Sequence, residues 1–166
     1  MIEIRDALAQ DARQLALIGI RSWEAAITSW GENSAKIRDN AHAAYRDFTA
    51  NYWDRIVVAQ ARGSILGWGA RENFDHRISD LWIDPQHHRR GVGTVLLNAL
   101  ENGVAAAGYE FAELETHARN TNAISFYEHF GYRVTSFSVK YSTSLQQDIE
   151  KVTMRKEIGD PADAQA

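Results

Sequence analysis

Several features are missing from this 166-residue sequence, and each absence excludes a class of protein. There is no cysteine, so disulfide bonds, cysteine-ligated zinc and thiol catalysis are ruled out. No apolar run is long enough to cross a membrane, and the N-terminus lacks the pattern of a signal peptide. Basic residues are not in excess, because the formal net charge is -4, which argues against general nucleic-acid binding. We therefore expect a cytoplasmic protein with neither a membrane nor a nucleic acid as partner.

Proline is scarce, and one of the two prolines marks a change of structure in the middle of the chain. Pro85 ends an extended, apolar-rich segment at residues 79–84, since proline cannot donate to a strand ladder. Gly108 stands where a helix commonly ends. Between them, an apolar stripe at helical spacing predicts a helix over residues 94–107, with Leu96, Leu97, Leu100 and Val104 on one face.

The loop that joins this strand to this helix, residues 86–93, is basic and contains two glycines. It leads into a helix N-terminus, whose unpaired N–H groups and partial positive charge favour an anion such as phosphate. Gly91 and Gly93 would let an oxygen approach the backbone closely, while Arg89 and Arg90 add positive charge. The P-loop and Rossmann patterns do not fit, because the Lys-Ser/Thr pair and the third glycine are not in place. A tight turn without a ligand is the alternative interpretation.

The predicted elements follow the order strand, two helices, three strands, helix, strand, helix, two strands. This order predicts an α/β fold with a mixed sheet. No internal repeat or linker is visible, so we expect residues 1–158 to form one domain and residues 159–166 a flexible tail. An early segment is rich in aromatic side chains, for which core packing is one interpretation and the lining of a substrate pocket the other: Trp23, Trp30, Tyr45, Phe48, Tyr52 and Trp53.

Two longer patterns point to a known family. The basic loop reads His88-Arg89-Arg90-Gly91-Val92-Gly93, and a second pattern runs from Asn120-Thr121-Asn122-Ala123 to Tyr127-Glu128-His129-Phe130-Gly131-Tyr132. Both resemble signatures of the GNAT superfamily, the acyl-CoA-dependent N-acyltransferases, and the element order matches over nearly the whole length. The resemblance implies a GNAT fold, with a central mixed, mostly antiparallel, twisted sheet of about seven strands flanked by about four helices.

The resemblance also implies acetyl-CoA as co-substrate and two places that bind it. The pantetheine arm would pair with the strand of Leu81, Trp82 and Ile83, as an added strand does, and would reach Asn120 and Ala123. Asn120 is equally suited to cap its helix. The pyrophosphate would rest on the loop and the first helical turn, formed by His88, Arg89, Arg90, Gly91, Val92, Gly93 and Thr94. The family normally has Gln or Arg at the first loop position, so protonated His88 or the neighbouring Arg89 is expected to take that role.

Acyl transfer to an amine needs a neutral amine, donors for the oxyanion and a proton for the departing thiolate. The family places a tyrosine beside the CoA sulfur, and the matching residue is Tyr127, whose phenol is protonated at neutral pH. The alternative interpretation is that Tyr127 is only a packing residue on the buried face of its helix. Some members use a glutamate matching Glu115 as base, and strand alternation puts Glu113, Glu115 and His117 on one face. The alternative bases are Asp80, His117 and a chain of water molecules. A solvated strand face with no catalytic role is the other interpretation of Glu113 and Glu115.

The resemblance predicts an N-acetyltransferase that acts on a primary amine of a small molecule or protein, by direct attack in a ternary complex. Asp80, Glu113 and Glu115, with few cations on the same strands, favour a cationic amine, although Arg77 and His117 leave an amino acid open. An acyl-CoA-binding sensor without turnover is the alternative function.

No metal is expected, because the adjacent His87 and His88 do not converge as metal ligands would. Homodimers are common in the family, but the sequence itself shows no interface.

Overall fold

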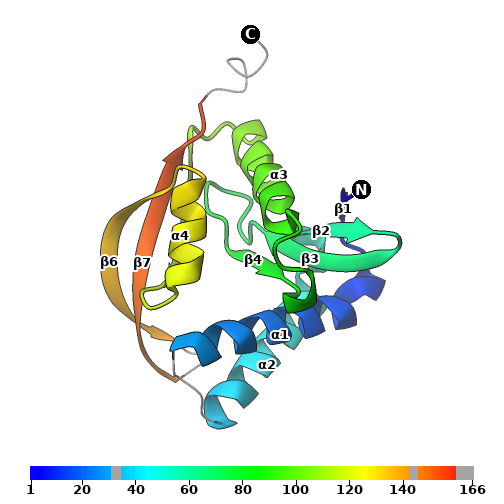
Figure 1. Cartoon of the computed structure of the whole chain (residues 1–166), viewed down its shortest axis with the longest axis horizontal. Coiled ribbons are helices and arrows are strands. Elements are labelled where there is room, and N and C mark those ends of the chain that lie inside the picture. The colour runs from blue at the N-terminus through cyan, green and yellow to red at the C-terminus, as the bar shows by residue number, and fades with distance from the viewer. Residues whose placement is uncertain (31–34, 143–145, 160–166) are drawn as a thin grey trace.

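The computed structural model describes residues 1–30, 35–142 and 146–159. Nearly all of the tail expected at residues 159–166 lies outside the described residues. The elements follow the predicted order, and the α/β fold with its seven strands and four α-helices among the described residues is confirmed (Figure 1).

The N-terminal half contains β1 (Glu3–Asp6), η1 (Ala9–Asp11), α1 (Ala12–Trp30), α2 (Ala35–Asn51), η2 (Trp53–Arg55), β2 (Ile56–Ala61), β3 (Ser64–Ala70) and β4 (Asp80–Ile83). The C-terminal half contains η3 (Pro85–His87), α3 (Val92–Ala106), β5 (Phe111–His117), α4 (Thr121–His129), β6 (Arg133–Ser142) and β7 (Gln147–Glu157). The η elements are single 3₁₀ turns.

The helix α3 begins at Val92, two residues earlier than the apolar stripe predicted. Gly91 has a φ of 79° and serves as its N-cap, a left-handed conformation that glycine adopts without strain. Helix α3 ends at Ala106, and Gly108 follows with a φ of 92°, in agreement with its expected place after the helix. The basic loop is therefore shorter than expected, because α3 begins directly after the first glycine, Gly91.

The strands form two antiparallel sheets, in the orders β1-β2-β3-β4 and β5-β7-β6. One parallel bridge joins them, between Arg77 and Glu113. The Ile78 N–H donates to the Glu113 carbonyl at 2.9 Å, and the Glu113 N–H donates to the His76 carbonyl at 3.0 Å. Beyond this bridge, β4 and β5 share no ladder among the described residues. The sheet thus splits where β4 begins.

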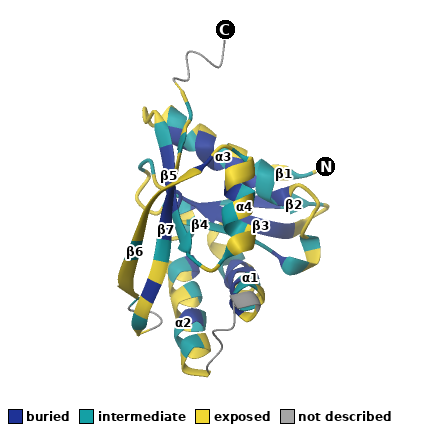
Figure 2. Cartoon of the chain, turned by 60° about the vertical axis from the view of Figure 1, so that its left-hand side comes forward, coloured by how far each residue is buried: buried dark blue, intermediate teal, exposed yellow. Residues whose placement is uncertain are grey.

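The helices cover both faces of the first sheet. Val58 of β2 packs in one cluster with Leu15 of α1, whereas the adjacent Ala59 packs with Leu96 of α3. Because neighbouring residues of a strand point to opposite faces, α1 and α3 lie on opposite sides. Figure 2 shows the buried residues concentrated in the strands between these helices, while most of β6 is exposed.

Trp68 of β3 attaches both N-terminal helices to the sheet. Its side chain is fully buried, its indole Nε1–H donates to the Leu15 carbonyl of α1 at 2.9 Å, and its ring stacks on Phe48 of α2 at 6.0 Å. Phe48 therefore has the packing role that was one of its two interpretations. A buried donor of this kind ties the position of α1 to the strand that leads toward β4.

We expect Trp68→Phe to lower the free energy of unfolding by about 1–3 kcal/mol, because it removes a buried donor and part of the ring volume. Urea denaturation followed by circular dichroism measures this change. Leu17→Ala is the matched control on α1, since Leu17 is 46% exposed. We expect it to stay within about 0.5 kcal/mol of the wild type. Equal stability of Trp68→Phe and the control would contradict the attachment.

Candidate active site

The basic loop is anchored at its start by Asp84, whose carboxylate is buried. One oxygen accepts from the Gln86 N–H at 3.2 Å, and the other pairs with the Arg21 guanidinium of α1 at 2.6 Å. Pro85 occupies the first position of the turn that follows. A single carboxylate thus holds the end of β4, the loop and α1 together. Arg21 could not be found from the sequence, because it lies 63 residues from Asp84.

The first turn of α3 offers backbone N–H groups without a side-chain cap. A Cβ placed on Gly91 would meet no described atom within 4 Å, so the space beside it is open. Gly93 is more crowded, since a Cβ there would lie 3.1 Å from the Phe126 ring of α4. Free donors, open space and the helix dipole together suit the pyrophosphate of acetyl-CoA.

His88 folds back onto β4 and does not extend the loop outward. Its Nε2 lies 3.3 Å from the Ile83 carbonyl, which also accepts from the Ser22 hydroxyl of α1 at 2.6 Å. Arg90 contacts His87 at 3.4 Å, and Arg89 is exposed. His88 is therefore engaged with backbone, and Arg89 and Arg90 are both exposed cations at this end of the loop.

Tyr127 of α4 and Asp80 of β4 lie within electrostatic reach of each other. Tyr127 is 9% exposed and packs edge-on against Phe126 and Tyr132, with ring centroids 5.3 and 5.6 Å away. Burial, and then the charge of Asp80, raise the pKa of the Tyr127 phenol. Burial also raises the pKa of Asp80, although its carboxylate accepts a hydrogen bond from Trp82 at 3.1 Å.

Tyr45 of α2 brings a second phenol to Asp80, from the other side of the sheet. Its ring meets Trp82 edge-on at 5.3 Å and lies against Gly19, where an added Cβ would come within 2.6 Å of the ring. Burial and the charge of Asp80 raise the pKa of Tyr45. The sequence had offered pocket lining or core packing for this aromatic, and the structure places it against Trp82 and beside Asp80.

Glu113 of β5 is a buried anchor. Its carboxylate accepts from Arg155 at 3.0 Å and from Arg77 at 3.1 Å. Burial alone would raise its pKa, but the hydrogen bonds from these two arginines outweigh that effect and lower it.

Glu115, two residues further along β5, is surrounded by cations. It pairs with Lys140 of β6, lies 3.7 Å from Arg77 and lies 4.0 Å from Lys151 of β7. The sequence predicted few cations on the strands that carry these carboxylates, and the cations around Glu115 come instead from β6, β7 and the segment before β4.

His117 and Asn120 flank the start of α4. The Nδ1 atom of His117 accepts from the Arg119 N–H at 3.1 Å. The Asn120 side chain accepts from the Ala123 N–H at 3.2 Å, so Asn120 is the N-cap that its residue type favours.

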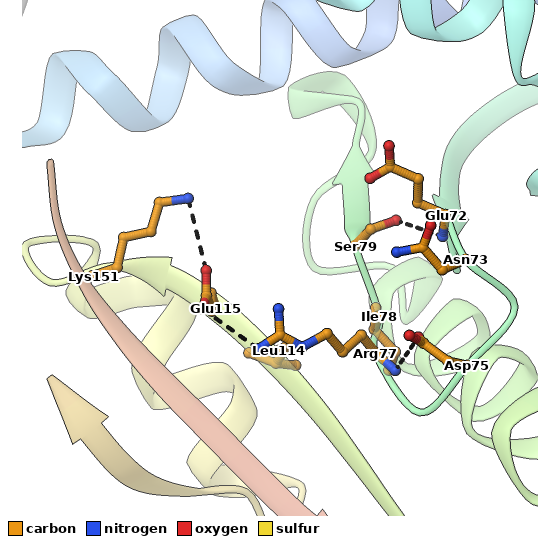
Figure 3. Close-up of a pocket in the computed structure, with 9 residues that line it drawn as sticks. All are labelled: Glu72, Asn73, Asp75, Arg77, Ile78, Ser79, Leu114, Glu115 and Lys151. Carbon is orange, nitrogen blue, oxygen red and sulfur yellow. Dashed lines mark hydrogen bonds and ion pairs between the residues drawn. The ribbon is translucent and has the colours of Figure 1, made fainter. Parts of the chain in front are cut away.

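A cavity of about 220 Å³ opens where β4 and β5 separate (Figure 3). It includes Glu115 and Arg77, both of which the sequence had pointed to as candidates for binding or catalysis. The residues around it are Glu72, Asn73, Asp75, Arg77, Ile78, Ser79, Leu114, Glu115 and Lys151. Asp80 is not among these residues, although it follows the lining residue Ser79 in the chain.

Within the described part of the chain, no helix is both long and apolar enough to cross a membrane. The same part of the chain holds no cluster of three or more His, Asp or Glu side chains that could hold a metal ion.

The proteins to which this chain is similar in sequence or in structure include several N-acetyltransferases. The chain is 26% identical over 126 residues to the N-alpha-acetyltransferase RimI of Mycobacterium tuberculosis, covering 72% of this chain and 77% of that protein. Its structure resembles a GCN5-related N-acetyltransferase from Rhodopseudomonas palustris, with a TM-score of 0.78, 24% identity and coverage of 94% and 95% of the two chains. It also resembles the PaiA N-acetyltransferase of Thermoplasma acidophilum in complex with coenzyme A, with a TM-score of 0.72, 21% identity and coverage of 95% and 99%.

The family assignment rests on a match over most of the chain. The acetyltransferase (GNAT) family model matches residues 17–132, which include most of α1, the split of the two sheets, the basic loop and α4. The chain therefore belongs to the acetyltransferase (GNAT) family and is an acetyl-CoA-dependent N-acetyltransferase.

Proposed function

We propose that the protein transfers the acetyl group of acetyl-CoA to a primary amine by direct attack in a ternary complex, with Asp80 as base and Tyr127 as acid. The observation that carries this assignment is the electrostatic interaction of Asp80 with the buried Tyr127, on the strand whose edge is left unpaired, among the described residues, where β4 and β5 separate. A sensor without turnover would have no need of a paired carboxylate and phenol there, and no feature of the described residues favours one.

The binding of acetyl-CoA follows from the free backbone groups. The first-turn N–H groups of α3, at Val92, Gly93 and Thr94, would receive the pyrophosphate, with Arg89 and Arg90 beside them. The pantetheine arm would lie along Leu81, Trp82 and Ile83, whose strand has no neighbour on its β5 side among the described residues. The carbonyl of Ile83 is already used by Ser22 and His88, so its contribution would come from the N–H group.

The base must take a proton from the amine so that the nitrogen can attack the thioester carbon. Asp80 suits this task because burial raises its pKa toward the range of a working base. Glu115 suits it less well, since accepting a proton would break its pairs with Lys140 and Arg77. We therefore propose Asp80 rather than Glu115 as the base, and a variant of Glu115 tests this choice.

The acid must deliver a proton to the sulfur as the carbon–sulfur bond breaks. The negative charge of Asp80 raises the pKa of Tyr127, so protonation of Asp80 by the amine removes one cause that holds the proton on the phenol. The base step thus prepares the acid step. After the thiol has formed, Asp80 can return its proton to the phenolate, which restores both side chains. An acceptor that enters as an ammonium loses a second proton as the tetrahedral adduct becomes the amide. That proton leaves to the solvent, so the products are the amide, the thiol and one proton.

The cofactor site is tested by Gly93→Val. The added side chain would enter the first turn of α3 and press on Phe126, so we expect the affinity for CoA to fall at least tenfold, about 1.4 kcal/mol. Isothermal calorimetry measures the affinity, and circular dichroism shows whether the fold is retained. Gly93→Ala adds only one methyl group and should show a smaller loss. Wild-type affinity in both variants would place the pyrophosphate elsewhere.

The acid is tested by Tyr127→Phe, which keeps the ring packing against Phe126 and Tyr132 and removes only the hydroxyl. We expect kcat to fall by about 10- to 10⁴-fold, the range for losing a general acid or base, with unchanged affinity for CoA. Thiol release under saturating acetyl-CoA gives kcat. A variant with wild-type turnover would leave Tyr127 as a packing residue only.

The choice of base is tested by the pH dependence of kcat/KM. The wild-type profile should fall at low pH as Asp80 becomes protonated, at a pH above the usual range of an aspartate because burial raises its pKa. Asp80→Asn should remove this acidic limb and lower kcat/KM by about 10²- to 10⁴-fold. Glu115→Gln should leave the limb in place. Loss or displacement of the limb in Glu115→Gln, with its retention in Asp80→Asn, would make Glu115 the base.

A further inference from the structure

The cavity where the sheets separate has walls of opposite charge. Figure 3 shows Glu72, Asn73 and Ser79 on the side of β3 and β4, with Glu115 and Lys151 across from them and Arg77 between. The two walls come from different sheets, so an occupant that bridges them would contact both.

The wall on the side of β3 and β4 is acidic and faces the proposed base. The Glu72 carboxylate has no hydrogen bond or ion pair with any described side chain, and its charge is close enough to act on Asp80. The neighbouring Ser79 hydroxyl donates to the Ala70 carbonyl. An ammonium group entering here would meet one unpaired carboxylate, Glu72, beside the carboxylate that takes its proton. This wall therefore recognises the amine end of an acceptor.

The opposite wall carries more positive than negative charge. Of its charged lining residues, Arg77 and Lys151 are cationic and Glu115 is anionic, whereas Asp75 adds a carboxylate on the acidic side with Glu72. Lys151 is the less tightly paired of the two cations, since its Nζ lies 4.0 Å from Glu115 and its side chain is 35% exposed. The net positive charge of this wall would be stabilised by an anionic group of the ligand. Lys151 is the cation most able to turn toward it.

We propose that the acceptor is a small zwitterion, an amino acid with a free carboxylate, whose amine lies by Asp80 and Glu72 and whose carboxylate is bound by Lys151 with Arg77. This inference rests on the proposed function and narrows its acceptor. It replaces the purely cationic amine that the acidic residues of the sequence favoured, because the structure adds the cations from other strands. The small cavity supports it, since about 220 Å³ lies below the roughly 300–1,000 Å³ of pockets for larger ligands.

The test uses matched acceptors and the intact protein. Thiol release from acetyl-CoA is measured with the twenty common L-amino acids, their amides, the corresponding decarboxylated amines, and a set of short peptides with free N-termini. For the best amino acid, we expect kcat/KM at least about 10-fold above that of its amide and amine. Peptides should react no better than the amide, because their carboxylate lies too far from the amine.

Variants of Lys151 then test whether this residue binds the carboxylate of the acceptor. Lys151→Met should lower kcat/KM for the best amino acid about 10-fold, mainly through KM, and leave its amide within about 2-fold. Lys151→Arg keeps the charge and should retain most of the preference. Arg13→Met is the control, because it removes an exposed positive charge at the start of α1 and touches no residue of the cavity lining.

The outcomes separate this inference from the function on which it rests. Equal use of acid and amide, a preference for peptides or decarboxylated amines, or an equal loss for acid and amide in Lys151→Met would overturn the zwitterionic acceptor and leave acetyl transfer intact. Absence of thiol release with every acceptor, while calorimetry shows that acetyl-CoA binds, would overturn both.

Discussion

The site depends on one constraint, the parallel bridge between Arg77 and Glu113 that holds the two sheets at a single point. The Glu113 side chain reinforces the bridge, because it accepts from Arg77 beside it and from Arg155 on β7. Both arginines stay charged, and they lower the pKa of Glu113, so the anchor persists at neutral pH. Asp80 lies three residues after Arg77 and Glu115 two residues after Glu113. The bridge therefore sets how far apart these two carboxylates lie.

The surroundings of Asp80 are unfavourable for its charge, which is typical of a functional position. Burial raises its pKa, and its charge in turn raises the pKa of Tyr45 and Tyr127, which approach from α2 and α4. A structural carboxylate would be expected to have an arginine beside it, as Glu113 does. Asp80 has a hydrogen bond from Trp82. The protein thus stabilises Glu113 as an anchor, whereas the environment of Asp80 suits the base that we propose.

Sequence reasoning succeeded where the information is local. The basic loop, its glycines, the Asn120 cap and the order of elements are set by residue types at short spacing, and the structure contains all of them. It failed where partners come from distant strands. Glu115 meets Lys140 across 25 residues, and alternation along β5 gives the face on which Glu115 lies but no information about β6. The sequence also could not predict the ion pair between Arg21 and Asp84, because nothing in the residues around either one indicates its partner.

Helix α1 contacts the surroundings of both proposed substrate sites. Arg21 and Ser22 hold Asp84 and Ile83, at the start of the loop that we propose binds the cofactor. Three residues before Ser22, Gly19 lies against the Tyr45 ring, which packs on Trp82 beside the proposed base. Since a helix is stiff over one turn, a displacement of α1 would move the loop and the Asp80 surroundings together. Direct attack requires both substrates at fixed positions relative to each other, and α1 is one element that links those positions.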